Sequence, residues 1–264
     1  MEDLKRNLTQ ELLQDINVKI MDTLSWSLPV HTVMAEYKTV MRTKMDILMK
    51  MMLITFKKEQ IASIEEIGAI LLVEPLFIED LVSKMQSAHL IEKKKDFFML
   101  TNEGIQQLES GIFSHEPEKD SKKMVYSPCH ESFLKENNNS ATYIEEKIYR
   151  YSKEFADWNV VSIKEDVLLN ALRLRGAEAT EENSQVVITE IITVSQIQRD
   201  LVPCIELRLY NEVEDVFYVR VWNTMLGHWD ETVEAVLNEK ELKTWREKYI
   251  KENTLTNKTP SPKK

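Results

Sequence analysis

Three consecutive lysines, Lys93, Lys94 and Lys95, form a compact run of positive charge. Neutralisation of phosphates by such ammonium groups supplies much of the affinity of proteins for DNA. A solvated turn is the alternative, because most short charged runs face water. Lys84 and the basic residues between 38 and 58 add to this charge if the fold brings them to the same face. We therefore expect any DNA contact at Lys84 and Lys93–Lys95.

Residues 76–88 predict a helix whose exposed positions carry a different chemistry. These positions are Leu76, Phe77, Glu79, Asp80, Ser83, Lys84 and Ser87. Bases are recognised chiefly by Arg, Lys, Asn and Gln, and here Lys84 is the one basic residue. An apolar pair at the start of the helix suits a protein surface better than a base edge. The pattern favours protein contact through Leu76, Phe77, Glu79 and Asp80, with base contact as the alternative.

A third group of candidate residues lies on the polar face of a predicted sheet. It contains Glu190, Glu206, Arg208, Tyr210, Tyr218, Arg220 and Trp222. Opposite charges on neighbouring strands often form pairs of little net energy. Arginine and aromatic side chains are also enriched where proteins bind partners. We keep Arg208 and Arg220 as candidate partner-binding residues beside the purely structural interpretation.

Catalytic and metal-binding patterns are weak. The adjacent Cys129 and His130 lack the second pair that a tetrahedral metal site needs. His228 lies close to Asp230 and Glu231, but no nucleophile or metal motif accompanies it. Helix capping by Asp230 is the simpler interpretation. The sequence predicts no cofactor, no metal and no enzymatic activity, with a small hydrolase or nuclease at His228 as a remote alternative.

Composition narrows the class of protein. The chain has 264 residues, a net charge of −10, 43% hydrophobic and 30% charged residues, which is typical of globular domains. The negative total opposes non-specific binding of nucleic acid by the molecule as a whole. Two cysteines far apart, a charged N-terminus and the lack of a long apolar segment predict a cytoplasmic protein without a membrane span.

The N-terminal residues 1–40 are expected to form a helix and an arm. Leu4, Leu8, Leu12, Ile16 and Ile20 follow at steps of four, which predicts a helix over 1–24. This helix docks on its own chain or forms a homodimer. Residues 28–37 then favour a strand or hairpin arm, and a methionine-rich helix is expected over 40–56, with its methionines in a core.

The next segment has the local signals of short helices and a hairpin. Ser63 and Glu66 have the spacing of a capping box, Pro75 opens a helix, and Thr101 caps another. Strands are expected on both sides of Lys93–Lys95. With its Leu-Thr-x-x-Gly feature at 100–104, the segment 41–112 resembles the winged helix-turn-helix domains of small bacterial regulators. The resemblance implies a module for DNA or protein contact, with the lysines on a wing beside phosphates.

The remaining chain predicts a second domain. A polar linker is expected over 114–141, an α+β domain over 142–252 and a disordered tail over 253–264. The domain would hold a helix beginning at Thr142, a helix over 164–174 and a closing helix over 229–249. Its strands, 186–194, 204–211 and 216–222, alternate in polarity and predict an antiparallel sheet with one apolar face. The fold class expected for the whole chain is α+β.

Three hypotheses follow for function. The first is a non-enzymatic, DNA-associated regulator or adaptor with a winged helix and a partner-binding or sensing C-terminal domain. The second is a protein-interaction subunit of a larger complex, which contacts its partner through Leu76, Phe77 and Glu79. The third is the hydrolase or nuclease. Recovery of a partner from the native host, with nuclease treatment as control, separates the first two.

Overall fold

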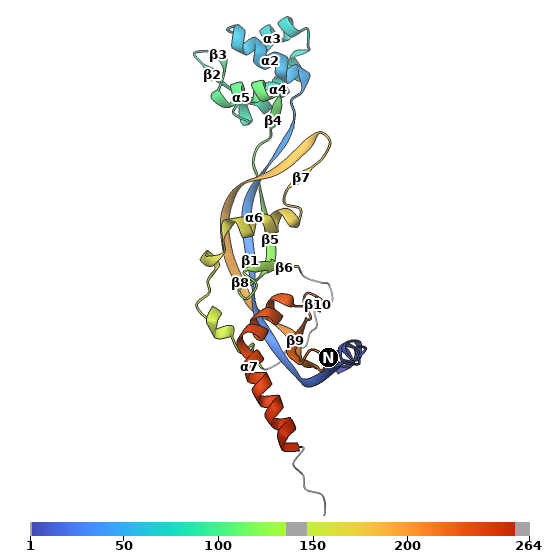
Figure 1. Ribbon diagram of the computed structural model, residues 1–264. Helices are drawn as coiled ribbons and strands as arrows, with labels where there is room; N and C mark the ends of the chain where they lie inside the picture. The colour runs from blue at the N-terminus through green and yellow to red at the C-terminus, as the bar shows by residue number, and fades with distance from the viewer. Residues whose placement is uncertain (1, 136–146, 257–264) are drawn as a thin grey trace, which may run out of the picture. The chain divides into compact units, whose positions relative to one another are not determined.

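The computed structural model describes residues 2–135 and 147–256, with side chains up to residue 250. Contacts divide the chain into two compact units. The first unit comprises residues 1–34, 123–168 and 194–264, and the second comprises residues 35–122 and 169–193. Figure 1 shows the elements of both units coloured along the chain.

One antiparallel sheet dominates the described fold, with strand order β10-β9-β8-β1-β5-β6, while β4 pairs with β1 and β7 with β8. Its two longest strands are β1 (Val18–Lys44) and β8 (Ser184–Asn211). The shorter strands are β4 (Ile112–Ser114), β5 (Glu118–Ser127), β6 (Ser132–Leu134), β7 (Ala179–Thr180), β9 (Val216–Asn223) and β10 (His228–Trp229).

The winged helix-turn-helix resemblance and the fold expected from it are wrong. The N-terminal region is one helix, α1 (Glu2–Leu12), followed by the 27 residues of β1 in the large sheet. This strand replaces residues 18–24 of the helix expected over 1–24 and residues 40–44 of the helix expected over 40–56. The physical reason is that residues 18–44 contain no glycine and a single proline, Pro29, so no turn interrupts them.

The pattern of burial explains why β1 was hard to predict. From Trp26 to Tyr37 most residues are buried consecutively rather than alternately. A strand that is covered on both faces gives a nearly continuous apolar run, which lacks the period of two that marks a half-exposed strand. Val30 and Thr32 were correctly expected in a strand, but the length of that strand was not predicted.

In the first unit, helices cover both faces of β8 and β9. Leu8 of α1 packs in one cluster with Ile205, Leu207 and Leu209 of β8. On the other face, helix α7 (Glu231–Thr256) contributes Val233, Leu237, Trp245 and Tyr249 to a cluster with Val219 and Val221 of β9. Figure 1 shows α7 in red beside these strands. The docking interpretation of the first helix therefore holds for Leu4, Leu8 and Leu12.

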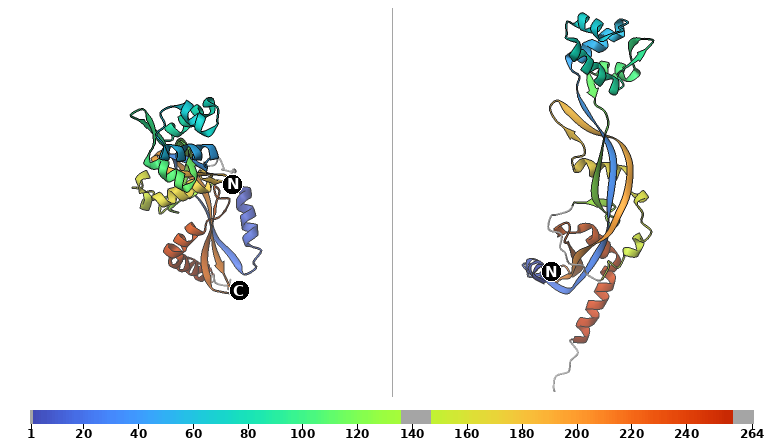
Figure 2. Two further views of the ribbon diagram at one scale, coloured as in Figure 1. Left: turned by 90° about the horizontal axis from the view of Figure 1, so that it is seen from above. Right: turned by 180° about the vertical axis from the view of Figure 1, so that it is seen from behind.

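In the second unit, residues 47–110 form what we call the helical cluster, inserted in the chain between the paired strands β1 and β4. Its elements are α2 (Ile47–Lys58), α3 (Ile64–Leu71), α4 (Pro75–Ser87), the hairpin β2 (Ile91–Lys94) and β3 (Phe97–Leu100), and α5 (Asn102–Ser110). Met49, Met52, Ile67, Ile78 and Met85 lie in its core. Figure 2 shows the hairpin at the edge of these helices.

Local signals of the cluster act as the sequence predicts. Ser63 Oγ accepts a hydrogen bond from the Glu66 amide at 3.2 Å, and Thr101 Oγ1 accepts one from the Gly104 amide at 3.0 Å. A Cβ atom at Gly104 would lie 2.0 Å from the carbonyl oxygen of Leu90. This close approach of α5 to the hairpin requires glycine at the last position of the Leu-Thr-x-x-Gly feature.

Several segments differ from expectation. Strands β5 and β6 occupy much of the segment 114–141 that was expected as a linker. The expected helix start at Thr142 lies outside the described residues. Between residues 147 and 164 the described chain forms the short 3-10 helices Ser152–Phe155 and Val160–Ser162 in place of the expected α-helix. Helix α6 (Glu165–Leu174) matches its prediction. Helix α7 continues to Thr256, and residues 257–264 of the expected tail lie outside the described part.

Candidate interaction surfaces

The most exposed apolar group of the second unit surrounds the turn between α3 and α4. Ile70 is 50% exposed, Leu72 91%, Leu76 72% and Phe77 61%. We call these four residues the apolar turn. The sequence placed Leu76 and Phe77 on the surface. It missed Ile70, within α3, and Leu72, at its end, because apolar residues of an amphipathic helix are ordinarily assigned to the core.

The backbone of the apolar turn is held in one shape. Leu72 ends α3 in the left-handed conformation, with φ 56° and ψ 41°. The amide of Val73 donates to the carbonyl of Gly68 at 3.0 Å, and Pro75 then opens α4. A residue with a Cβ in this conformation costs about 1–2 kcal/mol. Neither burial nor backbone preference accounts for leucine at position 72.

The helices on either side of the apolar turn are acidic. Helices α3 and α4 with their turn carry five carboxylates, those of Glu65, Glu66, Glu74, Glu79 and Asp80, and all five side chains are exposed. Lys84 is the one cation of this segment, and its Nζ is 2.7 Å from Asp80 Oδ2. The segment that carries the apolar turn is therefore acidic, with Glu74 inside the turn and Glu79 and Asp80 on α4.

The hairpin presents its lysines at a tight turn. Lys95 and Asp96 have φ values of 50° and 71°, and Lys93 lies over the ring of Phe98, 5.3 Å from its centroid. Lys94 and Lys95 line a cleft of about 600 Å³ together with Lys57 and Lys58 at the end of α2. The structure thus brings part of the basic 38–58 segment to the hairpin. Lys84 lines a different hollow, beside Ser83 and His115.

Arg208 and Arg220 lie on opposite faces of the sheet in the first unit. In the antiparallel pair β8–β9, Arg208 pairs with Val219 and Arg220 pairs with Leu207. Directly paired residues point to the same face, whereas consecutive residues alternate. The single polar face that we expected from the sequence is therefore wrong, because each face mixes polar residues of one strand with apolar residues of the other.

Both arginines are engaged with carboxylates of α7. Arg220 Nε donates to Glu234 Oε1 at 3.0 Å, and its guanidinium lies over the ring of Trp229. Arg208 Nε donates to Glu206 Oε1 at 2.9 Å, and Arg208 Nη2 lies 3.5 Å from Glu241 Oε2. These contacts fix α7 to the sheet.

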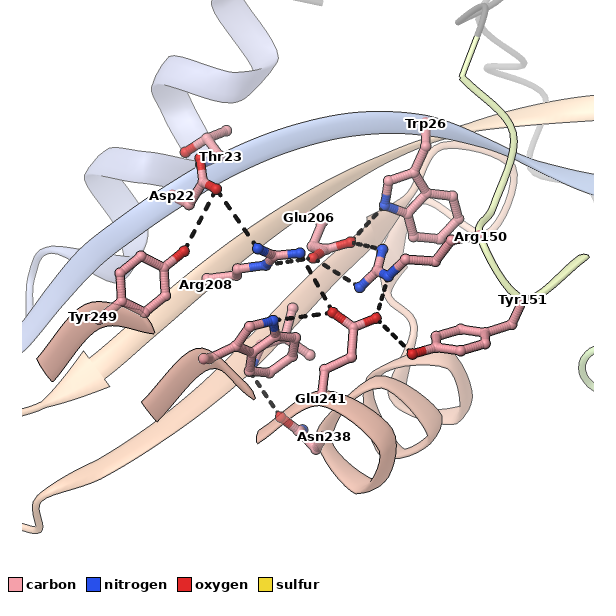
Figure 3. A network of polar contacts seen from close by, with 12 residues as sticks. Asp22, Thr23, Trp26, Arg150, Tyr151, Glu206, Arg208, Asn238, Glu241 and Tyr249 are labelled. Carbon is pink, nitrogen blue, oxygen red and sulfur yellow. Dashed lines mark hydrogen bonds and ion pairs between the residues drawn. The ribbon is translucent and has the colours of Figure 1, made fainter. Parts of the chain in front are cut away.

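A buried network extends from Arg208 through the first unit (Figure 3). Glu206 has no exposed surface and accepts hydrogen bonds from Trp26 Nε1 at 2.7 Å and from two nitrogens of Arg150 at 2.7 and 3.1 Å. Arg150 Nε also donates to Glu241, which accepts from Tyr151 at 2.9 Å. The network joins β1, β8, α7 and the chain at 150–151.

The electrostatics of this network favour its charged form. Burial opposes the charge of Arg150, but hydrogen bonds to Glu241 and Glu206 hold its pKa above the ordinary value. Burial also disfavours ionised Glu241, and the bonds from Arg150 outweigh it, so the pKa of Glu241 lies below the ordinary value. Each charge is satisfied by a neighbour in the same unit, which is typical of a structural support rather than of a reactive centre.

A serine, a histidine and an aspartate also meet in the first unit. Ser127 Oγ lies 2.7 Å from His130 Nδ1, and His130 Nε2 lies 2.9 Å from Asp230 Oδ1. Ser127 has no exposed surface, so its hydroxyl does not face a substrate. The sequence gave no sign of this arrangement, because His130 and Asp230 are separated by 100 residues.

Asp230 serves the start of α7. Its carboxylate accepts from the amide of Val233 at 3.1 Å and from Asn223 at 2.8 Å. Burial raises the pKa of Asp230, but His130 and these N–H donors outweigh it and hold the pKa below the ordinary value. The expected capping is present. His228 is exposed, and its Nδ1 contacts the carbonyl of Trp229 at 2.8 Å.

Within residues 2–135 and 147–250, no three His, Cys, Asp or Glu side chains are grouped as metal ligands. None of the described helices has both the length and the apolarity needed to cross a membrane. No family model, curated protein or solved structure matches this chain. The resemblance to winged helix-turn-helix regulators therefore has no support from a family match.

Proposed function

We propose that this protein is a non-enzymatic adaptor that binds a partner protein through the apolar turn of the helical cluster. The observation that supports the proposal is Leu72, a leucine 91% exposed in a left-handed backbone conformation. Strained residues of this kind are concentrated at functional positions. A binding role explains both the exposure of the side chain and the tolerance of the strain.

The surface favours a partner with a particular chemistry. Leu72, Leu76 and Phe77 offer apolar anchors, and the carboxylates of Glu74 and Glu79 lie close to them in sequence. A segment with apolar residues between lysines or arginines complements this arrangement. A second copy of the chain is a poor occupant, because two acidic segments would face each other.

The first unit is outside the proposed contact. Arg208 and Arg220 are held by carboxylates of their own chain, so they have less capacity for a partner than the sequence suggested. Cys129 and Cys204 are free thiols, which supports the cytoplasm as the proposed compartment.

The test combines capture with a position-specific cross-link. Tagged protein is recovered from the native host after nuclease treatment, with a photo-crosslinking amino acid in place of Leu76. We expect one stoichiometric partner that cross-links at this position and is lost in Phe77→Asp and Leu72→Asp. Val213→Asp is the matched control, because Val213 is 74% exposed in the β8–β9 turn of the first unit.

Two outcomes contradict the adaptor proposal. One is recovery of the same partner by wild type, control and both apolar-turn variants, which would place the contact elsewhere. The other is a clean monomer or homodimer without a cross-linked partner. Circular dichroism of each variant shows whether the helical cluster remains folded.

A further inference from the structure

We propose that the cleft between the end of α2 and the hairpin β2–β3 binds a single strand of nucleic acid. Lys57, Lys58, Lys94 and Lys95 would contact its phosphates, and Phe97 would stack on an unpaired base. The cleft is distinct from the apolar turn, so this inference does not depend on the adaptor proposal.

The hairpin register places charge and ring together. Lys94 of β2 pairs directly with Phe97 of β3, so their side chains lie on the same face of the hairpin. The cleft that they line has a volume of about 600 Å³ and also contains Met99, which is 49% exposed. Phe56 and Phe98 pack beneath it with ring centroids 5.5 Å apart. The cleft therefore has an apolar floor that is anchored in the core of the cluster.

The charge of the cleft is positive. Four lysines line it against one carboxylate, that of Glu59. Lys94 pairs with Glu92, and Lys57 lies 4.0 Å from Glu109, but the exposed fractions of these four side chains lie between 44% and 68%. Exposed pairs contribute little in water, so a phosphate can replace the carboxylate partner of either lysine.

The half-buried ring of Phe97 and the exposed thioether of Met99 favour a single strand over a duplex. Proteins that bind single strands combine a cationic groove with aromatic side chains on which bases stack. The bases of a duplex are paired and stacked, and they are not available to Phe97. The net charge of −10 also opposes a long duplex contact. A short strand limits phosphate contact to the lysines of the cleft.

Fluorescence anisotropy of the full-length protein tests the proposal. The probes are a labelled oligothymidylate of ~12 nucleotides, the corresponding oligouridylate and a duplex of equal length. We expect Lys94→Glu/Lys95→Glu to weaken single-strand binding at least ~10-fold and to reduce the slope of log K against log salt by about 1.4. Phe97→Leu should weaken binding without changing that slope, because it removes stacking and keeps apolar volume.

Lys50→Glu/Lys84→Glu is the matched control, since it makes the same charge change on α2 and α4 outside the lining of the cleft. Equal losses in this control would assign the effect to total charge and overturn the proposal. Duplex binding as tight as single-strand binding, or no binding by wild type at low salt, would also overturn it. Phe77→Asp should bind the probes normally, which separates failure of this inference from failure of the adaptor proposal.

Discussion

The guanidinium of Arg150 and the carboxylate of Glu206 form a two-point pair, with N–O distances of 2.7 and 3.1 Å. Glu206 is fully buried, whereas the side chain of Arg150 is 31% exposed. Arg150 therefore remains partly in contact with water while it neutralises the carboxylate of Glu206, which has no contact with water.

Removal of Arg150 should destabilise the first unit strongly. Arg150→Met leaves Glu206 buried with one charged partner fewer, and we expect a loss of about 3 kcal/mol in the free energy of unfolding. Arg173→Met is the control, because Arg173 pairs with Glu178 near the surface and should cost less than about 1 kcal/mol. Urea denaturation measures both. Equal losses of unfolding free energy in the two variants would show that the buried pair stabilises the fold no more than the surface pair does.

Acid should weaken the fold through Glu241. Its pKa is lowered in the folded state, mainly because Arg150 overrides the effect of burial. Its contribution to stability is therefore present above the unfolded pKa of about 4.3 and is lost as the pH falls through the folded value. Glu241→Gln should lower the free energy of unfolding at pH 7. It should also make the decrease of that free energy between about pH 5 and pH 2 less steep. Glu239→Gln, on an exposed part of α7, should leave the profile of urea midpoints unchanged.

Gly104→Ala should disrupt the helical cluster. The new Cβ would meet the Leu90 carbonyl at 2.0 Å, and relief requires α5 to move away from the hairpin. We expect a cost of about 1–3 kcal/mol, despite the higher helix propensity of alanine. Gly111→Ala has free space but a φ of +70°, so only backbone strain of about 1 kcal/mol applies. If Gly111→Ala lowers the melting temperature more than Gly104→Ala does, the close contact between α5 and the Leu90 carbonyl does not restrict position 104 to glycine.

Leu72→Gly should separate stability from binding. Glycine relieves the left-handed strain, so the free energy of unfolding should stay equal or rise by about 1 kcal/mol. Capture of the proposed partner should fall, because the most exposed apolar anchor is lost. Thermal denaturation and the photo-cross-link at position 76 measure the two effects. A less stable protein that still binds its partner would argue that Leu72 is structural.

Local chemistry predicted the helical cluster better than the sheet. Ser63, Pro75 and Thr101 mark helix starts through contacts with residues close in sequence, and these contacts are present. Strand β1 depends on pairing with β8 and β5, which are distant in sequence. Its continuous burial also removed the alternation that identifies strands. The large sheet was missed for this reason.

The register of β8 and β9 could have been predicted. The turn Glu212–Asp215 has four residues, so Asn211 pairs with Val216 and odd-numbered residues pair with even-numbered ones throughout. Arg208 and Arg220 are both even-numbered and must face opposite ways. Apolar residues take odd numbers in both strands, which suggested that they share one face. The register places them on opposite faces instead, so neither face is purely apolar. By contrast, no local signal joins Arg150 to Glu206, since 56 residues separate them.

The two long strands have a practical consequence for anyone who wishes to work with a fragment. Residue 34 lies in the first unit and residue 35 in the second, within β1, and β8 changes unit between residues 193 and 194. Each unit is assembled from separate stretches of the polypeptide. No single truncation yields either unit as a continuous expression product. A cut between the units severs β1, β5 or β8, or at residues 168–169 helix α6, rather than a loop.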